Sequence, residues 1–160
     1  MNIEICYRHA TIKDLKALIK YRIALFQEMG HINDLSTEKS FRKILERYFT
    51  EALSKNEFLS WVAEINGKII ASSGLVILKK PPTPRNPSGK EAYIMNMYTS
   101  PKWRKRGIAT RLLEEIFSFL REIKINKISL HATDIGVSVY EKMGFQTSDL
   151  EMIRRFNVSN

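Results

Sequence analysis

The sequence lacks the features of a secreted or membrane protein. Its 160 residues include one cysteine, Cys6, which has no partner in the chain for a disulfide. No apolar run approaches the ~20 residues that a membrane-spanning helix needs. The N-terminus lacks a basic segment followed by an apolar stretch, so we expect no signal peptide and a cytoplasmic protein.

Acidic residues are scarce relative to basic ones. The chain has 26 Lys and Arg against 17 Asp and Glu, which gives a formal net charge of +9. Such an excess attracts polyanions, for example nucleic acid, anionic lipid or phosphorylated small molecules. A chain of this length buries enough surface to fold without a disulfide or a structural metal. Its length predicts one domain over residues 1–160.

Hydrophobic periodicity and turn residues predict alternating strands and helices. Apolar residues at helical spacing indicate helices over 11–30, 34–53, 107–124 and 134–143. Strand-like patterns indicate strands over 3–8, 58–65, 68–78, 91–99 and 128–132, and one or two further strands within 145–156. Asn66-Gly67 favours a tight hairpin, and the prolines of 81–89 favour a loop. The order β-α-α-β-β-β-α-β-α-β predicts a mixed α/β sheet with helices on both faces.

One segment, from Met97 to Thr110, combines a strand end, a basic turn and a helix start that contains glycine and alanine. A helix N-terminus carries unpaired amides and a partial positive charge, and small residues there let phosphate oxygens approach the backbone. The ten positions 102–111 contain five basic residues and no acidic residue: Lys102, Arg104, Lys105, Arg106 and Arg111. We expect a pyrophosphate cradle, although a solvated basic helix start has the same composition. The chain contains neither of the common glycine-rich nucleotide motifs.

The hexapeptide from Arg104 to Ala109 resembles the Arg/Gln-x-x-Gly-x-Gly/Ala signature of the GNAT superfamily of N-acetyltransferases. Val139 to Phe145, Val-Tyr-Glu-Lys-Met-Gly-Phe, resembles the late Tyr-Glu-Lys-Leu-Gly-Phe motif of the same family. The resemblance implies acetyl-CoA as cofactor and a mixed, mostly antiparallel central sheet, which is flanked by helices on both faces and splayed at the cofactor site.

The resemblance also implies which residues hold the cofactor. The diphosphate would lie on the signature turn, which comprises Arg104, Lys105, Arg106, Gly107, Ile108, Ala109 and Thr110. The pantetheine arm would pair with the preceding strand at Met97, Tyr98 and Thr99. Thr133 and Asp134 occupy the loop where relatives contact pantetheine, although Asp134 suits a simple helix N-cap equally well.

Tyr140 matches the family tyrosine that protonates the departing thiolate. A phenol is a proton donor at neutral pH. The alternative is a tyrosine that only packs on the core. Cys6 stands in the first strand, where we expect a small buried side chain rather than a nucleophile.

The sequence defines the residues that bind the acetyl acceptor less clearly than those that bind the cofactor. Direct transfer to an amine needs a base that removes a proton from the ammonium form. The candidates are Glu28 and His31 at the end of the first helix, Tyr93 or Glu91 on the strand before the signature, and Asn96 as a hydrogen-bonding residue. The alternative for His31 is an ordinary surface histidine. Trp61 either lines the acceptor cleft or fills the core, and the core is favoured.

The resemblance therefore implies an acetyl-CoA-dependent N-acetyltransferase that acts on an amine of a small molecule or peptide. It allows a homodimer, and we expect no nucleic-acid, membrane or metal partner. The alternatives are an acyl-CoA sensor without turnover and, less favoured, a basic nucleic-acid-binding module, because the aromatic residues mostly follow core spacings.

Overall fold

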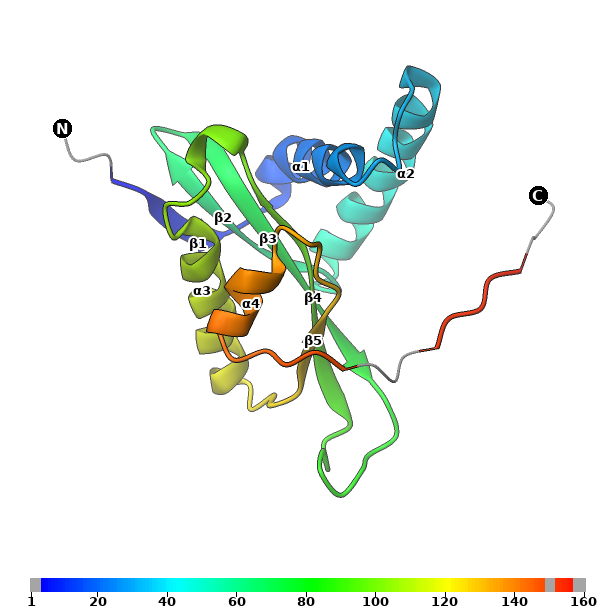
Figure 1. Ribbon diagram of the computed structural model, residues 1–160, viewed down its shortest axis with the longest axis vertical. Coiled ribbons are helices and arrows are strands. Elements are labelled where there is room, and N and C mark those ends of the chain that lie inside the picture. The colour runs from blue at the N-terminus through cyan, green and yellow to red at the C-terminus, as the bar shows by residue number, and fades with distance from the viewer. Residues whose placement is uncertain (1–3, 149–151, 157–160) are drawn as a thin grey trace.

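The computed structural model describes residues 4–148 and 152–156. The helices and strands follow the predicted order up to residue 148 (Figure 1). They are β1 Cys6–His9, η1 Ile12–Asp14, α1 Leu15–Glu28, α2 Leu35–Ser54, β2 Leu59–Ile65, β3 Lys68–Lys79, β4 Lys90–Thr99, η2 Pro101–Trp103, α3 Ile108–Glu122, β5 Ile128–Leu130 and α4 Val137–Lys142.

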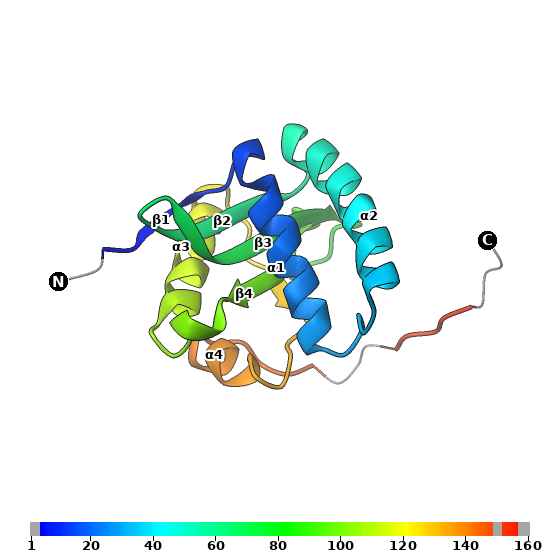
Figure 2. The same ribbon diagram turned by 90° about the horizontal axis from the view of Figure 1, so that it is seen from above.

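The strands form one sheet in the order β1-β2-β3-β4-β5. The first four strands are antiparallel to their neighbours, and β5 is parallel to β4. Helices α1 and α2 lie on one face of the sheet, and α3 lies on the other with α4 beside it (Figures 1 and 2). The mixed, mostly antiparallel fold class predicted from the sequence is confirmed.

Each face of the sheet has its own hydrophobic cluster. The amphipathic face of α3 packs on β2, β3 and β4 through Leu112, Leu113 and Ile116, all fully buried. Trp61 belongs to this cluster, so its predicted core role is confirmed. On the opposite face α1 and α2 contribute Ile19, Leu45 and other residues to the second cluster. The two clusters fix α1 and α3 on opposite sides of β4.

Strand β4 is distorted at Asn96. Its pairing with β3 shifts register between Ser72 and Gly74, and Asn96 has a φ of 54°. A left-handed residue of this kind is typical of a bulge. Strand β5 pairs with β4 only from Ala92 to Ile94. The two parallel strands therefore separate beyond Ile94, which confirms the predicted splay.

Two expectations from the sequence are wrong. Residues 145–148 and 152–156 contain no strand, and residues 149–151 lie outside the described part of the chain. The edge strand β5 offers only three residues for pairing, and Met152, Ile153 and Phe156 are exposed, so this segment lacks the burial that stabilises a strand. Cys6 is exposed rather than buried, because β1 is an edge strand and its side chain faces solvent.

Candidate functional site

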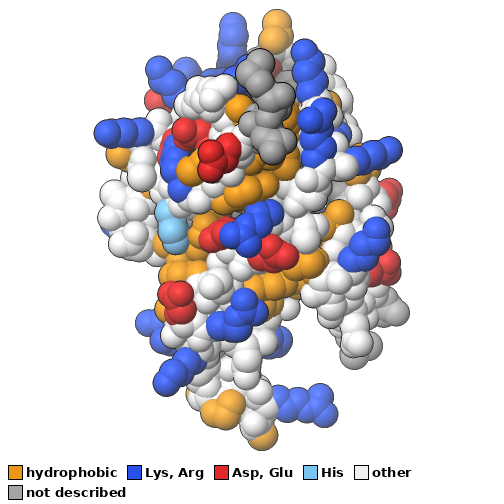
Figure 3. Space-filling view, turned by 90° about the vertical axis from the view of Figure 1, so that its left-hand side faces the viewer, with side chains coloured by type: hydrophobic (Ala, Val, Ile, Leu, Met, Phe, Trp, Pro, Cys, Tyr) orange, Lys and Arg blue, Asp and Glu red, His pale blue; other side chains and the backbone are white. Residues whose placement is uncertain are grey.

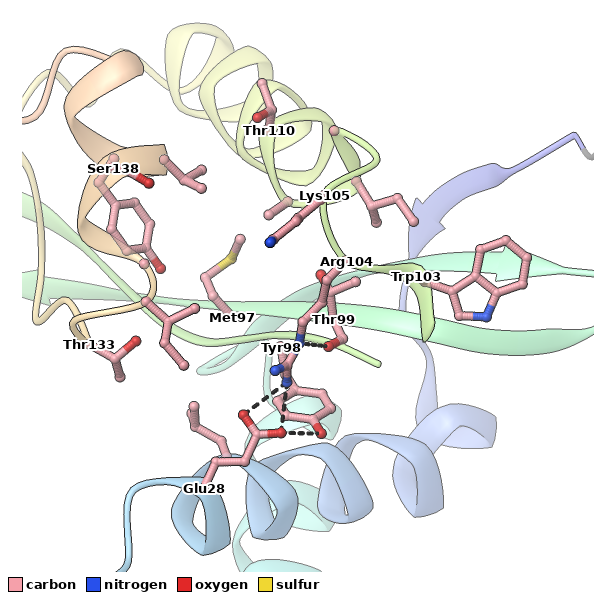
Figure 4. Close-up of a pocket in the computed structure, with 18 residues that line it drawn as sticks. Glu28, Met97, Tyr98, Thr99, Trp103, Arg104, Lys105, Thr110, Thr133 and Ser138 are labelled. Atoms are coloured by element: carbon pink, nitrogen blue, oxygen red, sulfur yellow. Dashed lines mark hydrogen bonds and ion pairs between the residues drawn. The ribbon is translucent and has the colours of Figure 1, made fainter. Parts of the chain in front are cut away.

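A cavity of about 340 Å³ opens where β4 and β5 separate. This volume lies within the range of ~300–1,000 Å³ that is usual for small-molecule sites. Its wall comes from β4, the turn before α3, the first turn of α3, the loop and helix around α4, and the end of α1 (Figure 4). We call it the donor pocket. Its lining residues are Leu25, Glu28, Met97, Tyr98, Thr99, Trp103, Arg104, Lys105, Gly107, Ile108, Ala109, Thr110, Thr133, Ile135, Gly136, Ser138, Val139 and Tyr140.

The turn before α3 has a backbone that suits an anion. Lys105 and Gly107 both have positive φ angles, 59° and 75°, and Gly107 is the N-cap of α3. The first amides of a helix have no acceptor within the helix, and they carry the positive end of its dipole. Gly107 and Ala109 leave these amides uncovered by large side chains. The Lys105 side chain points into the pocket (Figure 4), so a cation faces the same space.

The other basic residues of the segment have different surroundings. The Arg104 guanidinium turns toward α1, where Nη2 lies 2.7 Å from Oε1 and 2.8 Å from Oε2 of Glu28. Its Nε donates to the Thr99 carbonyl at 2.8 Å. Arg106 lies outside the pocket wall, with its guanidinium 4.9 Å from the centre of the Trp103 ring. Arg111 pairs with Glu114 and Glu115. Of these basic side chains, only that of Lys105 points at the pocket without an acidic partner among the described residues.

The splayed edge of β4 supplies the opposite wall. Met97 packs against the α3 cluster and lines the pocket. Tyr98 points the other way, stacks on Tyr21 at a centroid distance of 5.2 Å and donates to Glu28 at 3.0 Å. The Thr99 carbonyl is engaged by Arg104. The geometry leaves Met97 as the strand residue most directly presented to a ligand.

Tyr140 lines the pocket from α4. Its ring packs near Phe145, and burial raises the pKa of the phenol to about 12. Within residues 4–148 and 152–156 its hydroxyl has no hydrogen-bond partner. A Cβ on Gly136 would lie 2.9 Å from Tyr140 Cε2, so only glycine leaves room for the ring in this position. The phenol is protonated at neutral pH and can donate a proton into the pocket.

The structure separates the predicted acceptor residues. Glu28 lines the donor pocket, and both of its oxygens are engaged by Arg104 and Tyr98. Tyr93 bonds to Nδ1 of His131 and does not line the pocket. Asn96 is buried and accepts a hydrogen bond from Arg22. His31 is exposed and stacks on Phe26 at 5.7 Å.

Asp134 also lies outside the wall, whereas Thr133 belongs to it. Its alternative role as a helix N-cap is wrong, because Gly136 caps α4 and no side chain bonds to that end. The pocket wall also contains residues that the sequence did not indicate: Leu25, Trp103, Ile135, Gly136, Ser138 and Val139. The sequence could have indicated Leu25 as a pocket residue, because it lies one helical turn before the candidate Glu28 and therefore on the same face of the helix.

Basic side chains do not form a continuous stripe on the face that Figure 3 shows. Lys and Arg stand singly around its rim, and Asp and Glu are interspersed near its centre. Polyanion-binding surfaces usually gather their cations on one face or along one helix. In the part of the chain that the structure describes, no helix combines the length and apolar composition needed to cross a membrane. The same part contains no cluster of three metal-ligating side chains.

Comparison with known proteins agrees with the geometry of the pocket. Residues 24–145 match the model of the acetyltransferase (GNAT) family. The chain belongs to this family. As a GNAT protein it shares the fold of a predicted acetyltransferase from Clostridium acetobutylicum, whose crystal structure contains acetyl-CoA. The two are 36% identical, with a TM-score of 0.85 and coverage of 95% of this chain and 96% of that one.

A GCN5-related N-acetyltransferase from Ralstonia eutropha JMP134 is 30% identical, with a TM-score of 0.86 and coverage of 96% and 99% of the two chains. A mouse protein, probable N-acetyltransferase family 8 member 5, is 32% identical over 89 residues, which are 54% of this chain and 37% of that protein. The chain thus spans less than half the length of the curated relatives it matches. The predicted membership of the GNAT acetyltransferase family is confirmed.

Proposed function

We propose that this GNAT protein transfers an acetyl group from acetyl-CoA directly to an amine of a small molecule or peptide. The observation that carries the proposal is the pairing of two features in one cavity. The first is an anion-binding turn at the start of α3, and the second is the protonated phenol of Tyr140, whose hydroxyl has no partner among the described residues.

The residues present fit acetyl-CoA. The uncovered amides from Lys105 to Thr110, together with the Lys105 side chain, suit the diphosphate. The apolar side chains of Met97, Ile135 and Val139 suit the pantetheine arm. When bound, acetyl-CoA supplies a thioester that an amine can attack. Arg106 and Asp134 take no direct place in this pocket, and Arg106 contributes only its charge at the rim.

Tyr140 acts as the general acid in this proposal. Tyr140 would donate its proton to the sulfur that leaves when the amine takes the acetyl group, and its phenolate would regain a proton from solvent. The proton that the amine loses passes to solvent or to a base on the acceptor side. Glu28 is less suited to take it, because Arg104 and Tyr98 already hold both carboxylate oxygens. We assign Glu28 the role of holding α1 against the signature turn.

The finer predictions from the sequence remain part of the proposal. These are one domain over residues 1–160, a cytoplasmic location, a homodimer, and no nucleic-acid or membrane partner. The single sheet supports the prediction of one domain, and the dispersed cations of Figure 3 support the absence of a nucleic-acid partner.

The test is an acetylation screen of an amine panel that measures release of free CoA. Exposed Cys6 also reacts with thiol reagents, so the Cys6→Ser variant gives the background-free assay. We expect turnover with at least one amine and a higher Tm in acetyl-CoA but not in oligonucleotide. Stabilisation by acetyl-CoA without turnover of any amine would favour a sensor. Stabilisation by oligonucleotide alone would contradict the proposal.

A further inference from the structure

Arg22 of α1 lies against the bulge of β4. Its Nη1 donates to the side-chain oxygen of Asn96, and its guanidinium carbon lies 4.9 Å from the centre of the Phe26 ring. Asn96 directly precedes Met97 in β4, and Met97 lines the donor pocket. Leu25, one turn further along α1, lines it too. Neither Arg22 nor Asn96 lines that pocket, so the guanidinium lies on the α1 face of the sheet next to residues that form the pocket wall.

No acid neutralises this arginine within residues 4–148 and 152–156. None of their Asp or Glu side chains forms an ion pair with Arg22, whose recorded hydrogen bond uses Nη1 and leaves the Nε–Nη2 edge without an acceptor there. Burial lowers the pKa of Arg22, and the phenols of Tyr48 and Tyr93 are the titratable groups close enough to oppose that shift. A partly buried cation without an anion costs free energy. Its surroundings suit an anionic ligand.

Arg104, which lies near Tyr98, differs from Arg22 in its partners. Its Nε donates to the Thr99 carbonyl and its Nη2 pairs with Glu28, so this guanidinium has an acidic partner. Arg22 is held in place through Asn96 and Phe26, and its Nε–Nη2 edge has no acceptor among the described residues. Two parallel N–H groups on one edge of a guanidinium match the two oxygens of a carboxylate. One unneutralised cation also matches the single charge of a carboxylate better than the double charge of a phosphate.

We propose that Arg22 binds the carboxylate of the acetyl acceptor, so that the acceptor is an amine that also carries a carboxylate, such as an amino acid or short peptide. This inference rests on the proposed N-acetyltransferase function. Leu25, on the next turn of α1, lines the donor pocket, so an acceptor held by Arg22 would lie near the acetyl donor. Polyamines are positively charged, so Arg22 would repel them.

The experiment compares acceptors matched except for the anionic group: an amino-acid series, the corresponding carboxamides, aminoalkyl phosphates and a polyamine. We expect the wild type to prefer carboxylates to carboxamides by about 10-fold to 100-fold in kcat/KM, mostly through KM. Arg22→Gln removes most of this preference, and Arg22→Lys restores part of it. Lys16→Gln is the control, because it removes one exposed charge from the same helix away from the bulge.

A second readout separates the inference from the proposed function. In thermal shift with CoA present, the same carboxylates are expected to stabilise the wild type and Lys16→Gln but not Arg22→Gln. If no amine is acetylated but this pattern appears, the acetyltransferase proposal fails and the carboxylate site stands. If amines are acetylated without regard to the carboxylate, or if phosphates are preferred, the inference is overturned. Equal loss in Arg22→Gln for carboxylates and carboxamides also overturns it.

Discussion

The two faces of β4 are built in different ways. On the α3 face the donor pocket uses a contiguous turn, residues 104–110, whose backbone amides are the groups that we propose bind the diphosphate. On the α1 face the polar groups are side chains brought together across the chain: Arg22 meets Asn96 across 74 positions, and Arg104 meets Glu28 across 76. A site made of backbone keeps its function over many side-chain changes, whereas a site made of distant side chains defines specificity.

The largest predicted effect falls on the α3 face. Tyr140→Phe removes the proton donor and keeps the ring, so kcat should fall by about 10²-fold to 10⁴-fold, the usual contribution of general acid–base catalysis. The affinity for CoA and the Tm should stay close to wild type, because the hydroxyl has no partner to lose among the described residues. Steady-state kinetics and calorimetric titration with CoA measure both. Unchanged turnover would remove Tyr140 from its role.

The pH dependence tests the same residue. A phenol with a pKa of about 12 keeps its proton up to about pH 11, so Tyr140 should cause no fall in kcat/KM between pH 7 and 10.5. Over that range the rate should rise as the acceptor amine loses its proton. The measurement is a pH profile of the wild type. A falling limb near pH 9 that Tyr140→Phe abolishes would contradict the raised pKa.

A smaller effect is expected at the rim of the turn. Arg106→Glu reverses an exposed charge outside the pocket wall and should weaken CoA binding about 10-fold at low salt, through attraction to the phosphates. The difference from wild type should shrink as the salt concentration rises. Lys124→Glu, an equal charge reversal just after α3, serves as control. Equal weakening in both variants would mean that net charge alone attracts CoA.

The smallest effect is expected from Glu28. This carboxylate pairs with Arg104 and is partly exposed, and such pairs contribute about 0–1 kcal/mol. Glu28→Gln should lower the free energy of unfolding by less than about 1 kcal/mol and leave the rising limb of the pH profile in place. Denaturant titration and the same kinetic profile check this. Loss of the rising limb would make Glu28 the general base.

The contrast between the faces also explains what the sequence could predict. The sequence predicted the turn at Gly107 and the helix at Tyr140, because each is defined by residues that are neighbours in the chain. The sequence did not predict the side-chain pairs between α1 and the β4 region, because a local sequence pattern does not show which distant residue an arginine contacts. Arg104 shows the limit: the signature indicates a role for its backbone amide but says nothing of its side chain, which pairs with Glu28. The strand expected within 145–156 failed because local hydrophobicity cannot reveal whether a sheet edge is available.

The positive net charge of the chain says less about anion binding than the basic segment suggested. Of the five basic residues at positions 102–111, Arg104 and Arg111 have acidic partners, and Lys105 alone points into the pocket. In the proposed function the backbone of the turn therefore carries most of the anion binding. Arg22, the cation that we propose for the acceptor, stands outside that basic segment.

The most direct test of the account is a crystal structure of the protein with acetyl-CoA. We expect the diphosphate on the amides of residues 105–110 and the thioester sulfur within hydrogen-bond distance of the Tyr140 hydroxyl. We expect the acetyl group to face the side of β4 where Asn96 holds Arg22. Acetyl-CoA bound elsewhere, or a sulfur beyond the reach of Tyr140, would contradict it.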